Sequence, residues 1–260
     1  MVTAKVTVSN VGVAPRLVTT ALNLAEGDLK LHLTEPNGAT RDVRDVVVAC
    51  SDRRLAELQP GEKFTGVVQL HYTNQAFTFD QPGRYTLEFE LDTGDETGSV
   101  AHSEKAEIVI RPAVTAKEAK LQDLTMDQGV GISLALGDFG ADKAVQKKLG
   151  DAMDQFGDTY SGAACAMVLA NSLSRDFRDV RQNKVARKAD TKAADRALDM
   201  AFQKRDAATV AALATSVVSP REVDAPVLDQ VQARIAKAKK GAYKVHDLAM
   251  ADQILTDHLA

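Results

Sequence analysis

The chain has 260 residues, of which 45% are hydrophobic and 26% charged, and its net charge is −4. This composition is typical of a globular protein and excludes a largely disordered chain, and the length is sufficient for two ordinary domains. The negative charge gives no general reason to bind nucleic acid or an anionic membrane. No apolar run approaches the roughly 18 residues that a membrane span needs.

The N-terminal sequence MVTAKVTVSNVG predicts no secretory signal, because it has neither a charged first region nor an apolar core. Cytoplasmic residence is therefore the default, and an extracytoplasmic location is expected only if the chain is excised from a longer protein. The two cysteines, Cys50 and Cys165, are too few for a disulfide framework. We expect two free, buried thiols, with a single interdomain bridge as the alternative.

Up to about residue 113, apolar and polar side chains alternate with period two, which predicts strands with one face in a core. Turn signals of the Asn-x-Gly, Pro-Asn-Gly and Pro-Gly types separate the alternating runs. Seven or eight short strands with such turns indicate an antiparallel β-sandwich. The clearest alternating runs are residues 2–8, 29–33, 85–91 and 106–110.

Two motifs within residues 58–92 make this prediction more specific. Leu-x-Pro-Gly-Glu begins at Leu58, and Phe-x-x-Pro-Gly-x-Tyr-x-Leu begins at Phe79. Together they resemble the immunoglobulin-like and fibronectin-III-like domains of bacterial proteins. The resemblance implies that Tyr85 packs at a sheet corner and hydrogen-bonds back to the chain. It implies little about function, because such sandwiches serve adhesion, spacing, enzyme support and partner binding.

The segment Val-Thr-Val-Ser-Asn-x-Gly, residues 6–12, normally ends the second strand of the domains that the chain resembles. Here it belongs to the first alternating run. Three interpretations follow: a first strand that is absent, a chain cut from a longer protein, or an ordinary sandwich with a different N-terminal edge. An absent edge strand would leave backbone groups that invite pairing with another chain.

After Pro112 the apolar spacing changes to three and four, which predicts six to eight helices between residues 115 and 260. Thr115 and Glu118 match a capping box, and Asp190 and Asp224 are predicted N-caps. A last helix is expected from about Tyr243.

The predicted fold class is α+β with two domains, an N-terminal antiparallel immunoglobulin-like β-sandwich over residues 1–113 and a C-terminal all-α helical domain over residues 114–260. Within the second domain, residues 157–204 and 206–240 are weakly similar to tetratricopeptide-type hairpins. No 34-residue register recurs, so an array of repeats is not predicted.

The residue types that carry chemistry do not combine into a catalytic or metal-binding pattern. No histidine belongs to a His-x-x-x-His pair, which excludes the commonest zinc-hydrolase spacing. The glycine-rich segment 129–137 lacks the Lys-Ser/Thr of a phosphate loop, and we interpret it as a helix junction. The five histidines are His32, His71, His102, His246 and His258.

Potential nucleophiles and calcium ligands give equally weak signals. Cys165 lies in a thoroughly apolar stretch, so a core residue is favoured over a nucleophile. Asp92, Asp95 and Glu96 cluster in a loop but lack the alternating acidic pattern of a calcium cage. We therefore predict no catalytic, cofactor-binding or metal-binding residues and no cofactor.

One dense basic segment is the candidate interaction surface. Its residues recur mostly at a spacing of three, so on a helix they would share a face that could bind an acidic partner. The first half of the chain is itself acidic, with 11 Lys and Arg against 16 Asp and Glu. The alternative is a solvated helix face. The candidate residues are Arg175, Arg178, Arg181, Lys184, Arg187 and Lys188.

A second basic run, from Arg234 to Lys244, is interpreted as compensation for a helix dipole. The favoured function is a non-catalytic binding or structural module that engages another protein chain or itself, and not nucleic acid. Two alternatives stay open: an accessory or processed part of a larger hydrolase, similar to sandwich domains that flank bacterial peptidases, and a self-assembling subunit completed by strand exchange.

Overall fold

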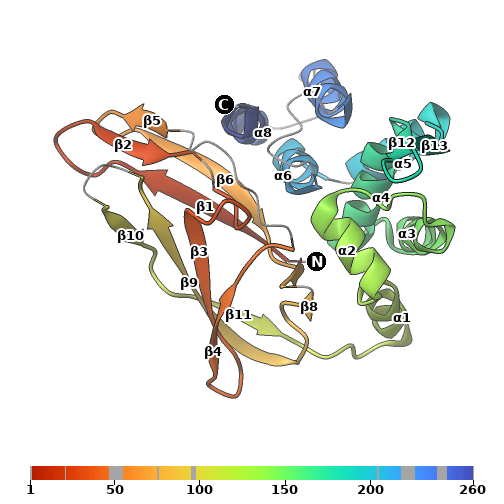
Figure 1. Cartoon of the computed structure of the whole chain (residues 1–260), viewed down its shortest axis with the longest axis horizontal. Coiled ribbons are helices and arrows are strands. Elements are labelled where there is room, and N and C mark those ends of the chain that lie inside the picture. Colours follow the sequence, from red (N-terminus) through yellow and green to blue (C-terminus); the bar gives the residue numbers. More distant parts are fainter. Residues whose placement is uncertain are drawn as a thin grey trace. The chain divides into compact units, whose positions relative to one another are not determined.

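The computed structural model describes residues 2–20, 22–46, 55–74, 76–94, 98–203, 205–217, 226–238 and 245–259 (Figure 1). The chain is α+β, with small antiparallel sheets and, in these residues, eight helices. Backbone contacts divide it into two compact units, with the boundary between Ala113 and Val114. The first unit contains the principal sheets, and the second contains all the described helices and one hairpin.

The sheet unit is organised around one long strand, β9. Strand β3 pairs with one edge of β9, while β10 and β11 pair with successive parts of its other edge. The remaining pairs are β3–β4, β1–β6, β2–β5 and β7–β8, all antiparallel. The strands are β1 (Thr3–Ser9), β2 (Arg16–Thr19), β3 (Leu29–Thr34), β4 (Thr40–Val43), β5 (Leu55–Leu58), β6 (Lys63–Gln69), β7 (Tyr72–Thr73), β8 (Ala76–Phe77), β9 (Gly83–Asp92), β10 (Val100–His102) and β11 (Ala106–Ile110).

Alternation of side chains builds the core of this unit. In β3, Leu29, Leu31 and Leu33 are 2%, 0% and 0% exposed, while Lys30 and His32 point to the other face. The four alternating runs predicted from the sequence are confirmed as β1, β3, β9 and β11. The inward side chains form one hydrophobic cluster: Leu22, Leu24, Leu29, Leu31, Leu33, Val43, Val68, Leu70, Phe79, Tyr85, Leu87 and Leu91.

Tyr85 is the polar member of this cluster. Its ring packs edge-on against Phe79 with centroids 5.1 Å apart, and its hydroxyl donates to the carbonyl of Gln81 at 2.9 Å. The Gln81 N–H in turn donates to the tyrosine oxygen at 3.2 Å. The hydroxyl is thus satisfied by the backbone just upstream, and burial raises the pKa of Tyr85.

The helical unit begins where the sequence predicts. The Thr115 hydroxyl accepts a hydrogen bond from the Glu118 N–H, and the Glu118 carboxylate accepts one from the Thr115 N–H. The predicted capping box is therefore confirmed. Asp190 likewise caps α5, whereas Asp224 and Tyr243 lie outside the described residues. The helices are α1 (Ala116–Thr125), α2 (Gln128–Leu136), α3 (Lys143–Phe156), α4 (Tyr160–Leu173), α5 (Thr191–Phe202), α6 (Ala207–Val217), α7 (Pro226–Ala238) and α8 (Val245–Leu259).

Helix α4 is the centre of this unit and packs against α3, α5 and α6. Every residue from Gly162 to Leu173 is buried, and the small side chains among them let neighbouring helices approach. A Cβ on Gly162 would lie 2.0 Å from the carbonyl oxygen of Phe156, so only glycine fits there. Of the glycine-rich segment predicted to be a helix junction, residues 129–136 lie inside α2, and only Gly137 lies at a junction, as the C-cap of that helix.

The predicted helix through the basic segment is wrong. Residues 177–187 form a hairpin of β12 (Phe177–Asp179) and β13 (Lys184–Arg187). The reason lies in side chains that compete for backbone N–H groups. Asp176 accepts from the Ala189 N–H, and Asp179 accepts from the N–H groups of Arg181 and Gln182.

Candidate interaction site

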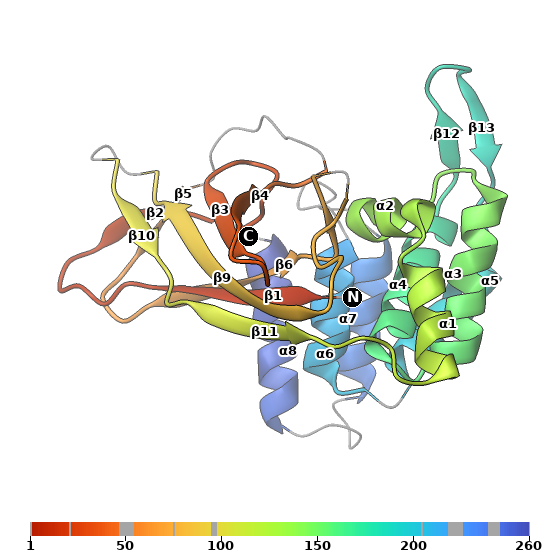
Figure 2. The ribbon, with the colours of Figure 1, turned by 90° about the horizontal axis from the view of Figure 1, so that it is seen from below.

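Residues 174–189, which we call the cationic hairpin, connect α4 to α5 and extend away from the helices (Figure 2). Their ends are held together by a hydrogen bond of 2.9 Å from the Asp190 N–H to the Leu173 carbonyl. The segment contains six Lys and Arg against two Asp. The structure therefore presents the predicted basic segment as a projecting hairpin and not as one face of a helix.

The tip of the cationic hairpin has a defined turn. One carboxylate oxygen of Asp179 accepts from the Arg181 and Gln182 N–H groups at 2.9 and 3.2 Å. Asn183 follows with a φ of 47°, in the left-handed region that Asn tolerates better than most residues. The Arg178 guanidinium donates to the Asn183 side chain at 3.0 Å and so links the two strands.

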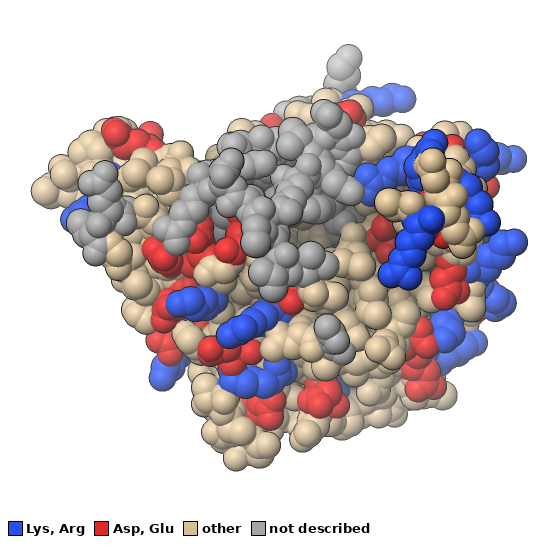
Figure 3. Space-filling model, in the orientation of Figure 1, with Lys and Arg blue, Asp and Glu red and all other residues tan. Residues whose placement is uncertain are grey.

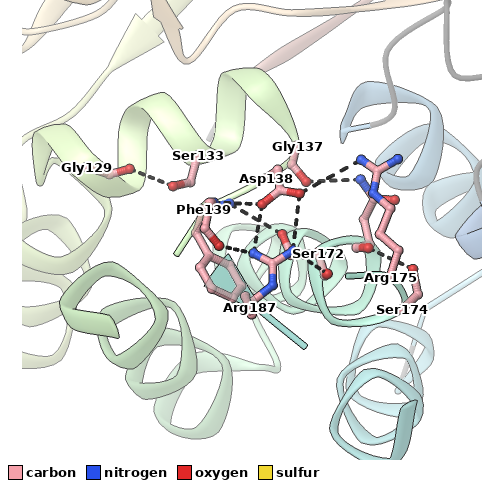
Figure 4. Close-up of polar contacts among 11 residues, drawn as sticks. Gly129, Ser133, Gly137, Asp138, Phe139, Ser172, Ser174, Arg175 and Arg187 are labelled. Carbon is pink, nitrogen blue, oxygen red and sulfur yellow. Dashed lines mark hydrogen bonds and ion pairs between the residues drawn. The ribbon is translucent and has the colours of Figure 1, made fainter. Parts of the chain in front are cut away.

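Arg187 anchors the base of the hairpin, as Figure 4 shows. Its guanidinium donates to Asp138 Oδ1 at 3.0 Å, to the Ser172 carbonyl at 2.6 Å and to the Gly140 carbonyl. These acceptors belong to the loop between α2 and α3 and to the end of α4. A single side chain of β13 therefore ties the hairpin to two other elements by charge-assisted hydrogen bonds.

Two aromatic rings enclose the same guanidinium. Its central carbon lies 4.4 Å from the Phe139 ring centroid and 5.5 Å from that of Phe177. The Arg187 side chain is only 9% exposed, and its Nε has no hydrogen-bond partner in the described part of the chain. A cation this buried is stable only because a carboxylate, carbonyls and ring faces replace its water.

A shift in strand register explains how Arg187 comes to point inward. Phe177 lies opposite Arg187, whereas the next residue, Arg178, lies opposite Val185. Ala186 is the extra residue of this irregularity, and such bulges redirect the side chains beside them. Arg175 also approaches Asp138, at 3.9 Å. Two of the six predicted residues are therefore parts of the anchor.

The other four, Arg178, Arg181, Lys184 and Lys188, are exposed. Lys188 lies 3.5 Å from Asp176, but among the described residues Arg181 and Lys184 form no ion pair. In Figure 3, drawn in the orientation of Figure 1, Lys and Arg side chains gather over the region labelled β12 and β13. Val180 stands among these cations at the tip and is 86% exposed.

Asp176 has a structural role in this group. The Ala189 N–H donates to its carboxylate at 2.8 Å and, with the nearby Lys188 ammonium, lowers the pKa of Asp176. Both interactions favour the charged form, so the carboxylate stays ionised at neutral pH and keeps the two ends of the hairpin together.

The loop that holds Arg187 was not identified from the sequence. Asp138 and Phe139 lie between Gly137 and Gly140, whose φ angles are 69° and 63°. Asp138 also accepts from the Gly140 N–H at 2.7 Å, which fixes its carboxylate toward the hairpin. The Gly-Asp-Phe-Gly sequence signals a tight turn, but nothing in it indicates an arginine about fifty residues downstream.

Two further residues singled out in the sequence, Cys165 and Arg234, lie within the packed helices or between them. Cys165 is fully buried in α4, and burial raises its pKa to about 12, so its thiol is protonated and unreactive at neutral pH. Arg234 bridges α7 to α5 through Asp195 at 3.6 Å and through Asp199. Cys50, Asp95, Glu96 and the lysines from Lys239 to Lys244 lie outside the described residues.

Two features are absent from the described residues. They contain no group of three or more His, Cys, Asp or Glu side chains that could hold a metal ion. None of their helices is long and apolar enough to cross a membrane. Comparison of the chain with models of protein families, with curated proteins and with solved structures found no match.

Proposed function

We propose that this protein is a non-catalytic binding module whose cationic hairpin docks an acidic surface of another protein. The observation that carries the proposal is that the basic residues of the hairpin have two different positions. Arg187 is buried and anchors the base, while four other basic residues are exposed on the projecting part: Arg178, Arg181, Lys184 and Lys188. A hairpin fixed at both its base and its turn has little backbone entropy left to lose on binding.

The tip favours a protein over nucleic acid as the partner. Val180 is almost fully exposed between the cations, and an apolar side chain can pack against another protein but gains nothing from a phosphate backbone. Arginine, which flanks it, is enriched at protein interfaces. The aromatic ring of the segment, Phe177, faces Arg187 at the base and is not presented for base stacking. The net charge of −4 gives the chain no general attraction to a phosphate backbone.

We further propose that the sheet unit is an immunoglobulin-like sandwich that serves as a scaffold. Support comes from Tyr85, which is buried and bonded to Gln81 in the manner that the resemblance implies. Further support is the order β4–β3–β9 with β10 and β11 beyond it, which places the tyrosine strand in the middle of a sheet.

Photo-crosslinking tests the binding proposal directly. A photoreactive amino acid in place of Val180, in the cells that make the protein, is expected to capture a partner with an acidic surface. The same substitution at Val109, an exposed position of β11, is the matched control. Capture from position 180 alone, abolished by the double substitution Arg181→Glu and Lys184→Glu, supports the proposal. Capture that survives the charge reversal, or crosslinks chiefly to RNA, contradicts it.

A further inference from the structure

Strand β1 (Thr3–Ser9) has a second edge that no described strand occupies. It pairs with β6 alone, in continuous antiparallel register from Thr3 opposite Gln69 to Ser9 opposite Lys63. Exposed edges are usually protected by shortness, proline, bulges or several charges. Within its seven residues β1 has no proline, no bulge and one charge, Lys5. It is therefore poorly protected against pairing with another strand.

The side chains of β1 that face the core are incompletely covered. Val2, Ala4, Val6 and Val8 pack against the hydrophobic cluster but are only partly buried. The equivalent leucines of β3, which has a neighbour on each side, are at most 2% exposed. An additional strand beside β1 would remove this apolar surface from water.

The hydrogen bonds of β1 show which backbone groups reach the open edge. The Val2 carbonyl accepts from the Leu70 N–H, and the Asn10 N–H donates to the Glu62 carbonyl. Because these groups alternate along an antiparallel strand, even-numbered residues face β6. The N–H and C=O groups of the odd-numbered residues, including Lys5 and Thr7, therefore point to the opposite edge.

Other edges are less suited to pairing. β4 has four residues, including Arg41 and Asp42, and β10 has only three. β11 has five residues, of which Glu107 is in an ion pair with Arg84. β6 also has seven residues, one charge and an edge that no described strand occupies, but its core-facing Val68 is only 3% exposed. The low charge and partly buried face of β1 therefore make it the edge that another strand would extend with the greatest gain.

We propose that two copies of this protein pair through β1, antiparallel and edge to edge, so that their β1–β6 sheets become continuous. The strand is self-complementary about Val6: Val6 lies opposite Val6 of the second copy, Ala4 opposite Val8, and Lys5 opposite Thr7. This register pairs Lys5 with Thr7 on both sides of Val6 and keeps the apolar face in phase. A shift of two residues would instead place Lys5 opposite Lys5, which opposes pairing. Such an isologous contact closes as a dimer.

Proline at position 5 tests the use of this edge. Lys5→Pro removes an N–H that points away from β6, so it leaves the β1–β6 hydrogen bonds in place. Sedimentation velocity of the full chain is expected to show a concentration-dependent dimer for the wild type and a monomer for this variant. Circular dichroism and thermal unfolding of the same samples verify that the variant is folded. A monomeric wild type, or a folded Lys5→Pro variant that still dimerises, overturns the proposal.

A pair of substitutions at position 7 tests the register. Thr7→Glu places a carboxylate opposite Lys5 of the second copy, twice per dimer, and is expected to lower the dissociation constant about fivefold. Thr7→Lys places two cations together and is expected to raise it by a similar factor. Both variants lose the 3.0 Å hydrogen bond between Thr7 and Thr65, so this loss cancels in the comparison. Equal dissociation constants for the two variants overturn the register.

Discussion

At the scale of single residues, Arg187 shows how one side chain decides the shape of a surface. The basic residues of segment 175–188 look alike in the sequence, and yet one of them is 9% exposed and bonded to Asp138, Gly140 and Ser172. The hairpin therefore owes its position to a residue that is unavailable to a partner. Its chemistry is specific to arginine, because the lysine ammonium has three donors but neither the planar stacking surface nor the rigid fork of five donors.

Substitution of this residue should be costly. Arg187→Ala removes the anchor and leaves Asp138 with the Gly140 N–H at 2.7 Å and with the more distant Arg175 at 3.9 Å. We expect the free energy of unfolding to fall by about 2–4 kcal/mol in urea denaturation. The exposed control Arg178→Ala should change it by less than about 0.5 kcal/mol. Equal effects of the two substitutions would show that Arg187 is not the anchor.

His32 should make stability depend on pH near neutrality. Asp42 lies 2.8 Å from Nδ1, and Glu90 lies 3.4 Å from Nε2, with Lys30 and the cross-strand Glu88 also on this face. The hydrogen bond to Asp42, followed by that to Glu90, raises the pKa of His32 above 6.5 despite partial burial. The stabilisation is therefore complete below pH 6.5 and is lost as pH rises through the raised value.

The histidine contribution can be isolated by substitution. The pKa of Glu90 is lowered from 4.5, so its own contribution changes only in acid and does not overlap that of His32. Denaturation between pH 6 and about 8.5 should show the wild type losing stability relative to His32→Gln as pH rises. Parallel pH profiles for the two proteins would contradict this assignment.

At the scale of elements, substitution by alanine is expected to have opposite effects at two glycines of the helical unit. Gly150 is inside α3, and a Cβ there meets nothing within 4 Å, so Gly150→Ala should stabilise by about 0.5–1 kcal/mol. A Cβ on Gly162 would collide with the backbone at the end of α3, so Gly162→Ala should destabilise by about 1–3 kcal/mol. Thermal unfolding of both variants measures this. Stabilisation by both would mean that α3 and α4 do not meet this closely.

The regular elements were predictable because each depends on local pattern. Alternation located β1, β3, β9 and β11, and the capping residues Thr115 and Asp190 located α1 and α5. The cationic hairpin could not be predicted from local pattern. Arginines at a spacing of three suit a helix, but the hydrogen bonds of Asp176 and Asp179 and the contact with Asp138 favour the hairpin. These contacts depend on residues that are distant in the sequence or on the competition between side chain and backbone.

At the scale of the whole molecule, the two proposed surfaces belong to different units. The cationic hairpin is part of the unit that begins at Val114, and β1 is part of the unit that ends at Ala113. Each unit has its own hydrophobic core. Substitutions in β1 are therefore expected to change self-association without altering the hairpin, and substitutions in the hairpin to change partner binding without altering dimerisation.

The central claim is that the cationic hairpin binds an acidic protein surface through Arg181 and Lys184. The most direct test is the dissociation constant of the partner captured at position 180, measured for the wild type and for the Arg181→Glu and Lys184→Glu double variant over a range of salt concentrations. Exposed charges are screened by salt, so we expect wild-type binding to weaken as salt rises, and the double variant to bind about tenfold or more weakly at low salt. Equal dissociation constants for the two proteins at low salt would contradict the claim.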